Sequence, residues 1–226
     1  MKITDIHSHT YFSACGADKH EDIIEAAING GIEVFGICDH CYGIGERRRE
    51  YCDIITEMKQ KYEGKIKLLC GIEIATVPNL GLYDPEDLLP EFEYCLIEHI
   101  DRDNTTVGEG IFEYAKRFNC KTGIAHTDLI GMARNRGYDP VEFLHRFAEN
   151  DIFWEMNVNY DSIHGFNEHA YVRSFFTDEE TQNIVRSSGI KLTVGFDGHR
   201  VYDYAPERVR TMNKFIFDNG FNFQEF

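Results

Sequence analysis

The sequence has no long hydrophobic run. No apolar stretch approaches the ~18 residues that a membrane-spanning helix needs, and the opening MKITDIHSHT lacks the basic and then apolar pattern of a signal peptide. Internal repeats, low-complexity tracts and Pro/Ser-rich linkers are also missing. With 226 residues, of which 42% are hydrophobic, the chain can bury a sizeable core. We expect one soluble domain, residues 1–226, located in the cytoplasm and without a membrane partner.

Positive charge is scarce. The chain has 23 basic and 39 acidic residues, a formal net charge of −16. Such a surface repels polyanions, which argues against nucleic acid as a partner. A small anionic substrate remains compatible with this charge, because bound divalent cations can reverse the field inside a site.

The seven cysteines form an odd set without a disulfide-like spacing. Several, such as Cys38, Cys70 and Cys95, lie inside apolar runs where a thiol behaves as a small hydrophobic group. We therefore expect reduced thiols.

Short apolar runs rich in β-branched residues recur along the chain and predict about seven strands. They lie near residues 2–6, 33–38, 66–71, 93–97, 122–125, 152–156 and 191–196.

Helical patterns with clear ends lie between these runs. One covers residues 21–29, and another covers 140–149 after Asp139. Thr177 to Glu180 has the pattern of a capping box that opens a helix ending at Gly189. Pro206 lies in the first turn of the last predicted helix, which ends before Gly220.

Alternation of strands and helices predicts an α/β fold with parallel strands, either a closed barrel or an open sheet. Nearly every predicted strand is followed by a residue type that binds metals. A barrel brings all such strand ends to one face, whereas an open sheet spreads them along a line. We therefore favour a seven-stranded barrel. Residues 75–90 are the longest irregular segment and a candidate lid over the site.

Histidines and acidic residues mark the strand ends. His7 and His9 are two residues apart, so their side chains leave one face of the first strand. Six of the ten histidines follow apolar runs in this way. Scattered surface histidines do not explain that pattern, and the mixture of imidazoles and carboxylates suits zinc, iron or manganese better than calcium or magnesium. The candidate metal ligands are His7, His9, His40, Glu73, His99, His126, Asp197 and His199.

Together, HSH at 7–9, DH at 39–40, GIE ending at Glu73, His99, His126 and DGH at 197–199 resemble the polymerase and histidinol phosphatase (PHP) domain superfamily. The resemblance covers essentially the whole chain. It implies a distorted (β/α)7 TIM-like barrel that holds two or three divalent transition metals.

Carried over by residue, the resemblance implies that His7, His9 and Asp197 hold one metal. Glu73 would bridge to a second metal on His99 and His126, and a third would use His40 and His199. The family commonly adds a histidine from the loop after the first motif, where this chain has YFSACGADKHED. Cys15, Asp18 or His20 can replace that histidine as a ligand of the third metal. Otherwise the third site is weak or empty.

For several other polar residues the sequence leaves two roles open. His145 falls inside a predicted helix and fits a packing or surface histidine, whereas His164 and His169 lie in a loop that can face the site. Asp39 precedes His40 and either orients a metal ligand or caps a helix.

Metals lower the pKa of bound water from ~15.7 toward ~7, and a metal-activated hydroxide of this kind can hydrolyse a phosphomonoester. Among four arginines that closely follow metal-binding residue types, we select Arg134 and Arg200 to bind the phosphate of a small substrate. The segment AHTDLIGMARNRGYDP resembles the histidinol-phosphatase branch, which makes L-histidinol phosphate a candidate.

Three alternatives stay open. An amidohydrolase also begins with HxH but typically has a metal-bridging lysine where this chain has Glu73. A phosphodiesterase or nuclease is disfavoured by the charge of −16. A non-catalytic metal-binding module is the third. The sequence does not predict the oligomeric state.

Overall fold

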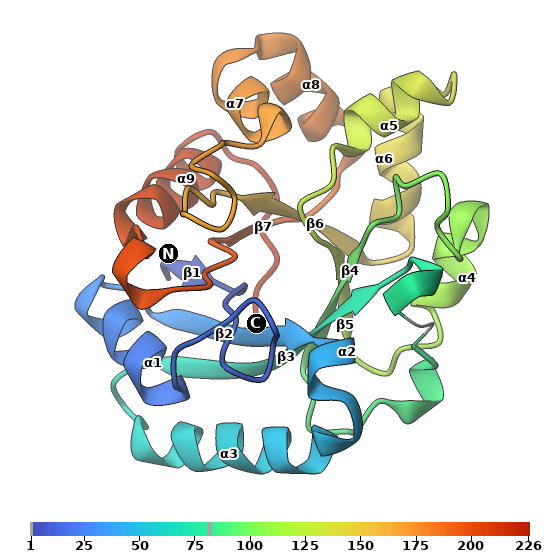
Figure 1. Cartoon of the computed structure of the whole chain (residues 1–226). Helices are drawn as coiled ribbons and strands as arrows, with labels where there is room; N and C mark the ends of the chain where they lie inside the picture. Colours follow the sequence, from blue (N-terminus) through green and yellow to red (C-terminus); the bar gives the residue numbers. More distant parts are fainter. Residues whose placement is uncertain (1, 81–82) are drawn as a thin grey trace.

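The computed structural model describes residues 2–80 and 83–226. Seven parallel strands form one sheet in which each strand pairs with the next along the chain (Figure 1). The strands are β1 (Thr4–Asp5), β2 (Val34–His40), β3 (Lys67–Ala75), β4 (Tyr94–Glu98), β5 (Lys121–Ile124), β6 (Ile152–Asn157) and β7 (Leu192–Gly195).

The sheet curls until its first and last strands meet. The Ile6 amide donates to the Val194 carbonyl at 3.0 Å, and Ser8 pairs with Gly198 in a parallel bridge. The predicted seven-stranded α/β barrel is therefore confirmed as a nearly closed, single-domain barrel. Because all strands run in parallel, their carboxyl ends share one face.

Helices surround the strands on the outside of the barrel (Figure 1). They are α1 (His20–Asn29), α2 (Cys41–Ile44), α3 (Arg48–Lys61), α4 (Ile111–Ala115), α5 (Leu129–Asn135), α6 (Pro140–Glu149), α7 (Ala170–Thr177), α8 (Glu179–Ser188) and α9 (Pro206–Asp218). Between β3 and β4 the described residues form only short 3-10 turns, at Pro78–Leu80 and Pro85–Asp87, which is where the barrel departs from regular alternation. No helix in the described ranges has the length and apolar character to cross a membrane.

The predicted helix ends agree with the structure except at one cap. Asp139 caps α6 by accepting from the Glu142 amide at 3.0 Å. At α8, however, the cap is Asp178 and not Thr177, because Thr177 ends α7 and its hydroxyl donates to the Arg173 carbonyl. The Asp178 carboxylate accepts from the Glu180 and Thr181 amides at the start of α8.

A tyrosine spans the barrel interior. Tyr94 points from β4 across the barrel, and its hydroxyl donates to the Ile6 carbonyl. A Cβ at Gly71 would lie 2.2 Å from the Tyr94 ring, so glycine at this position leaves the room that the ring needs. The ring packs with Leu69, Leu96 and other buried side chains below the metal-binding face.

Candidate metal centre

All eight predicted metal ligands converge at the carboxyl ends of the strands. Six of them line one pocket of about 430 Å³, and His7 and His9 lie buried beside it. The pocket is lined by Ala14, Cys15, His40, Tyr42, Glu73, Glu98, His99, Arg102, His126, Ile163, His164, His169, Asp197 and His199. This volume falls in the range of small-molecule sites.

Glu73 lies at the centre of this group and is fully buried. Its Oε1 accepts from His126 Nε2 at 2.9 Å, and its Oε2 lies 2.7 Å from His40 Nδ1. The same Oε2 is 3.4 Å from His7 Nε2 and 3.5 Å from His9 Nε2. One carboxylate therefore faces four imidazoles from three other strand ends, which is the placement that a bridging ligand requires.

His7, His9 and Asp197 form a tight group at the seam between β1 and β7. His9 Nε2 lies 3.0 Å from Asp197 Oδ1, and His7 Nε2 lies 3.6 Å from the same oxygen. These atoms meet the distance expected of ligands to a common ion. The seam that closes the barrel thus also assembles this group.

Unusual backbone conformations aim three of the ligands. His99, His126 and Asp197 have φ values of 64°, 23° and 57°, which L-residues other than glycine adopt rarely. Each follows the end of its strand, where the turn directs the side chain over the barrel. Strained backbone of this kind concentrates at functional sites.

The Nδ1 atoms of three histidines are held by acceptors outside the metal group. His7 Nδ1 donates to Glu155 at 2.8 Å, His199 Nδ1 to Asp161 at 3.2 Å, and His9 Nδ1 to the Ser13 hydroxyl at 3.1 Å. With the proton on Nδ1, each Nε2 keeps a lone pair directed at the centre, which is the tautomer that a metal ligand needs.

Glu155 was not singled out from the sequence, although it lies in a predicted strand. Its second oxygen accepts from the His126 amide at 2.8 Å, so one carboxylate orients residues of two strands. A Cβ at position 195 would lie 1.9 Å from Glu155 Oε1, and Gly195 therefore makes this contact possible.

Glu98 is a second residue that the sequence reading missed. It ends β4, is buried, and lies 3.3 Å from His40 and 3.2 Å from His99. The signal was its place directly before His99 at the end of an apolar run. With His40 and Glu73, Glu98 forms another group that can hold an ion.

Asp39 orients ligands rather than capping a helix. Its carboxylate accepts from the Thr10 amide at 2.8 Å and from the Ser13 hydroxyl at 2.6 Å. Ser13 in turn contacts His9 Nδ1 and accepts from the His40 amide. Asp39 thereby fixes the loop that follows the first histidine motif.

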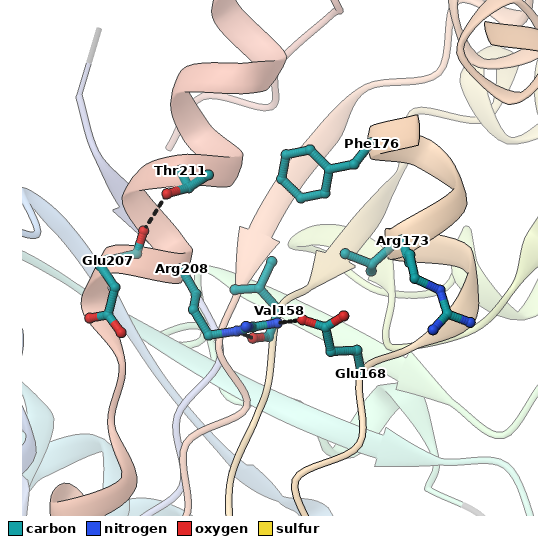
Figure 2. A pocket seen from close by; sticks show the side chains of 8 residues that line it. Val158, Glu168, Arg173, Phe176, Glu207, Arg208 and Thr211 are labelled. Carbon is teal, nitrogen blue, oxygen red and sulfur yellow. Dashed lines mark hydrogen bonds and ion pairs between the residues drawn. The ribbon is translucent and has the colours of Figure 1, made fainter. Parts of the chain in front are cut away.

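The β6–α7 loop, residues 158–169, covers one side of the pocket. Asp161 is buried in it and accepts from both His164 and His199, and His164 and His169 line the pocket. Arg208 anchors the loop from α9. Figure 2 shows its guanidinium reaching Glu168, and it also donates to the Val158 carbonyl at 2.9 Å. Both ends of the loop are held by one side chain.

Several residues discussed from the sequence lie elsewhere. Arg134 pairs on the surface with Glu180 at 2.7 Å. Arg200 does not line the pocket itself, but its guanidinium donates to the backbone carbonyls of two lining residues, Cys15 and His199. The arginine among the lining residues is Arg102. His145 contacts the Ser188 carbonyl, and His20 is buried against aromatic rings at the start of α1.

The candidate lid, residues 75–90, does not contribute to the pocket lining in its described part. Its strand-like beginning belongs to β3, which extends to Ala75. Gly81 and Leu82 lie outside the described residues.

Buried polar atoms in this pocket fit bound metals. Among the described residues, His7 Nε2, His40 Nδ1, Glu73 Oε2, Glu98 Oε1 and His99 Nδ1 are buried without a hydrogen bond, although His40 Nδ1 and Glu73 Oε2 face each other at 2.7 Å. Such atoms are costly to bury alone. A cluster of divalent ions would pair all of them, and the mixture of nitrogen and oxygen donors suits zinc, iron or manganese.

The pKa values predict that metal affinity rises with pH. Burial lowers the pKa of His126, but the hydrogen bond and charge of Glu73 outweigh it and raise the pKa to about 9. Burial also lowers the pKa of His199, but the charge of Asp197 and the hydrogen bond that His199 donates to Asp161 outweigh it and raise the pKa to about 10. At pH 7 both rings are therefore protonated without metal, and the metal must displace the protons.

From pH 7 toward 9 the apparent constant for filling the sites that contain His126 and His199 should increase by up to about 100-fold per unit, since each ring releases a proton, and the increase should level off as the pH reaches the pKa of His126. Titration with zinc in weakly buffered solution, with a pH indicator, checks the release of at least about two protons. An affinity independent of pH across this range would contradict the pKa assignment.

The comparisons with known proteins agree with this architecture. A family model for the PHP domain matches residues 5–221. The fold is similar to histidinol phosphate phosphatase from Lactococcus lactis, solved with zinc, L-histidinol and phosphate, at 18% identity and a TM-score of 0.62, covering 98% of this chain and 95% of that one. It is also similar to a candidate histidinol phosphatase from Listeria monocytogenes, at 14% identity and a TM-score of 0.58, covering 89% of this chain and 97% of that one. None of the curated proteins matches in sequence. The chain belongs to the PHP domain family.

Proposed function

We propose that this protein is a metal-dependent phosphoesterase that hydrolyses a small phosphomonoester, with L-histidinol phosphate as the leading candidate. The observation that carries the proposal is the convergence of six histidines, Glu73 and Asp197 in and beside one pocket at the carboxyl face of the barrel. Membership of the PHP domain family supports the same reaction class.

We assign the metals as the PHP resemblance implies, and the close grouping of His7, His9 and Asp197 supports the first of these sites. His7, His9 and Asp197 would hold the first, and His99 and His126 the second, with Glu73 bridging. His40 and His199 would contribute to a third. Bound ions of this kind activate water and offset the charge that develops on phosphate oxygens.

The chain's own residues supply orientation. Glu155 and Asp161 fix the rings of His7 and His199 through Nδ1. Arg102 lines the pocket, and a guanidinium there can bind two phosphate oxygens at once. We therefore add Arg102 to the substrate-binding prediction. Arg134 and Arg200 stay predictions, because the guanidinium of Arg134 pairs with Glu180 and that of Arg200 binds the Cys15 and His199 carbonyls.

The surroundings of Arg102 favour a substrate with a cationic leaving group. Arg102 also lines an adjoining polar cavity of about 600 Å³. Asp101, Asp103 and Asp128 line that cavity together with Arg102 and Arg136, so three carboxylates stand beside two guanidinium groups. L-Histidinol phosphate carries an amine beside its phosphate ester and matches this arrangement. The Lactococcus phosphatase was solved with L-histidinol and phosphate, which supports the same choice.

The test is phosphate release by zinc-loaded protein from L-histidinol phosphate, nucleoside monophosphates and sugar phosphates. We expect kcat/KM to be highest for histidinol phosphate, and Asp101→Asn to raise KM for that substrate more than for a sugar phosphate. Glu142→Gln, an exposed change on α6, serves as the control.

Other outcomes assign other functions. Equal rates with all phosphomonoesters would remove histidinol phosphate as the specific substrate. Metal binding without phosphate release from any monoester would overturn the proposal and favour a phosphodiesterase, an amidohydrolase or a non-catalytic metal-binding module.

A further inference from the structure

A sulfur atom joins the imidazoles at the edge of the metal pocket. Cys15 is half-buried, and its Sγ belongs to a group with one ring nitrogen each from His9, His40 and His199. These four atoms all lie within 4.8 Å of one another. The ring of His9 lies 4.5 Å from the rings of both His40 and His199. The group therefore has the composition and closeness of a metal site.

The loop that carries Cys15 is tightly constrained on its N-terminal side. Asp39 holds Thr10 and Ser13 through four hydrogen bonds. A Cβ at position 16 would lie 2.1 Å from the Thr10 carbonyl oxygen, so only glycine allows the chain to turn this closely after Cys15. The turn brings the half-buried thiol close to the imidazoles of His9, His40 and His199.

Arg200 fixes Cys15 relative to His199. One guanidinium nitrogen, Nη1, donates to the Cys15 carbonyl at 2.6 Å and to the His199 carbonyl at 2.8 Å. The Val201 amide donates to the Asp18 carboxylate at 2.7 Å and closes the same junction. Arg200 thus links two segments that lie 185 residues apart in sequence. It does so through the backbone carbonyls of Cys15 and His199, whose side chains belong to the same histidine–cysteine group.

The other cysteines in the described part of the chain lie in different surroundings. Five are buried in apolar packing, and Cys120 is half-buried before β5, where the strand begins. Cys15 is the cysteine that joins a histidine group. Its placement is specific and not a general feature of the thiols.

We propose that the Cys15 thiolate is a ligand of the third metal, together with His40 and His199, and that this position selects a thiophilic ion such as zinc over manganese. In this assignment His9 binds the first metal, together with His7 and Asp197. Thiolates bind zinc strongly, whereas manganese prefers oxygen ligands. The inference rests on the metal centre proposed above and is independent of the substrate.

Cobalt(II) provides a readout that does not depend on activity, because a cobalt–thiolate bond absorbs in the near ultraviolet. We expect the fully cobalt-loaded protein to show this band. Cys15→Ser should abolish the band, Cys15→His should also abolish it, and Cys120→Ser, the matched control, should retain it. Elemental analysis should give three zinc ions in the natural protein, two in Cys15→Ser and three in Cys15→His.

Manganese loading supplies a second test, with at most two ions expected in the natural protein. Loss of Cys15 should lower affinity for the third zinc by more than the ~10–100-fold typical of losing an outer-shell partner. A missing band in the natural protein at full loading, or a band that persists in Cys15→Ser, would overturn the proposal. If the band is present while no phosphomonoester is hydrolysed, the thiolate ligand stands and the proposed phosphatase function falls.

Discussion

Replacing Glu73 with glutamine should remove at least one metal from the purified protein and lower phosphate release by about 10²–10³-fold, the range for losing one preorganised charge contact at an active site. The carboxylate faces His7, His9, His40 and His126 within 3.5 Å. Glutamine keeps the shape but brings no negative charge, and its amide group would present a donor to the imidazoles or the ions. Elemental analysis and a phosphate-release assay measure the two effects.

Glu149→Gln is the matched control for this change. Glu149 is exposed at the end of α6, where it forms an ion pair with the surface His145. It should retain full metal content and rate. Circular dichroism separates loss of metal from loss of fold. Full metal content and activity in Glu73→Gln would disprove the bridging role.

Glu155→Gln should weaken metal binding by about 10–100-fold, although Glu155 itself belongs to no metal group. Its two oxygens accept from His7 Nδ1 and from the His126 amide. A glutamine amide has one acceptor oxygen and one donor NH₂ group. In either orientation, its NH₂ group would face the N–H of His7 Nδ1 or of the His126 amide. The buried mismatch should also cost about 1–3 kcal/mol of folding free energy.

Competition with a metal indicator measures the affinity, and urea unfolding of the metal-free protein measures the stability. Glu25→Gln is the control, because Glu25 also accepts a hydrogen bond, from the Tyr62 hydroxyl, but lies outside the barrel. Unchanged affinity in Glu155→Gln would show that His7 does not depend on this contact for its orientation.

The sequence predicted the fold because its local signals agree with one another. Each strand is a short apolar run, and helix ends are marked by residues such as Pro140 and Gly189. The errors were local. The N-cap of α8 is Asp178 because Thr177 is the last residue of α7. Strand β3 continues to Ala75 because the residues after Glu73 still pair with β4.

The ligand group was visible in the sequence because a parallel barrel places every strand end on one face. Supporting residues were not visible, since their partners are set by tertiary contacts. Glu155 and Asp161 orient histidines that are 148 and 38 residues away. Arg134 follows the site closely in sequence, yet α5 directs it to Glu180 on the surface. A residue that follows a metal ligand closely in sequence can therefore still point away from the site.

The seam between β1 and β7 also sets when the protein can acquire metal during synthesis. His9 and Asp197 meet across this seam although 188 residues separate them. At about 5–20 residues per second, the ribosome makes the last of these ligands about 10–40 s after the first. Until then, His7 and His9 lack Asp197, and β1 lacks its neighbour β7 at the seam. A complete centre therefore marks a chain whose barrel has closed, and a nascent or misfolded chain has only fragments of the site to offer an ion.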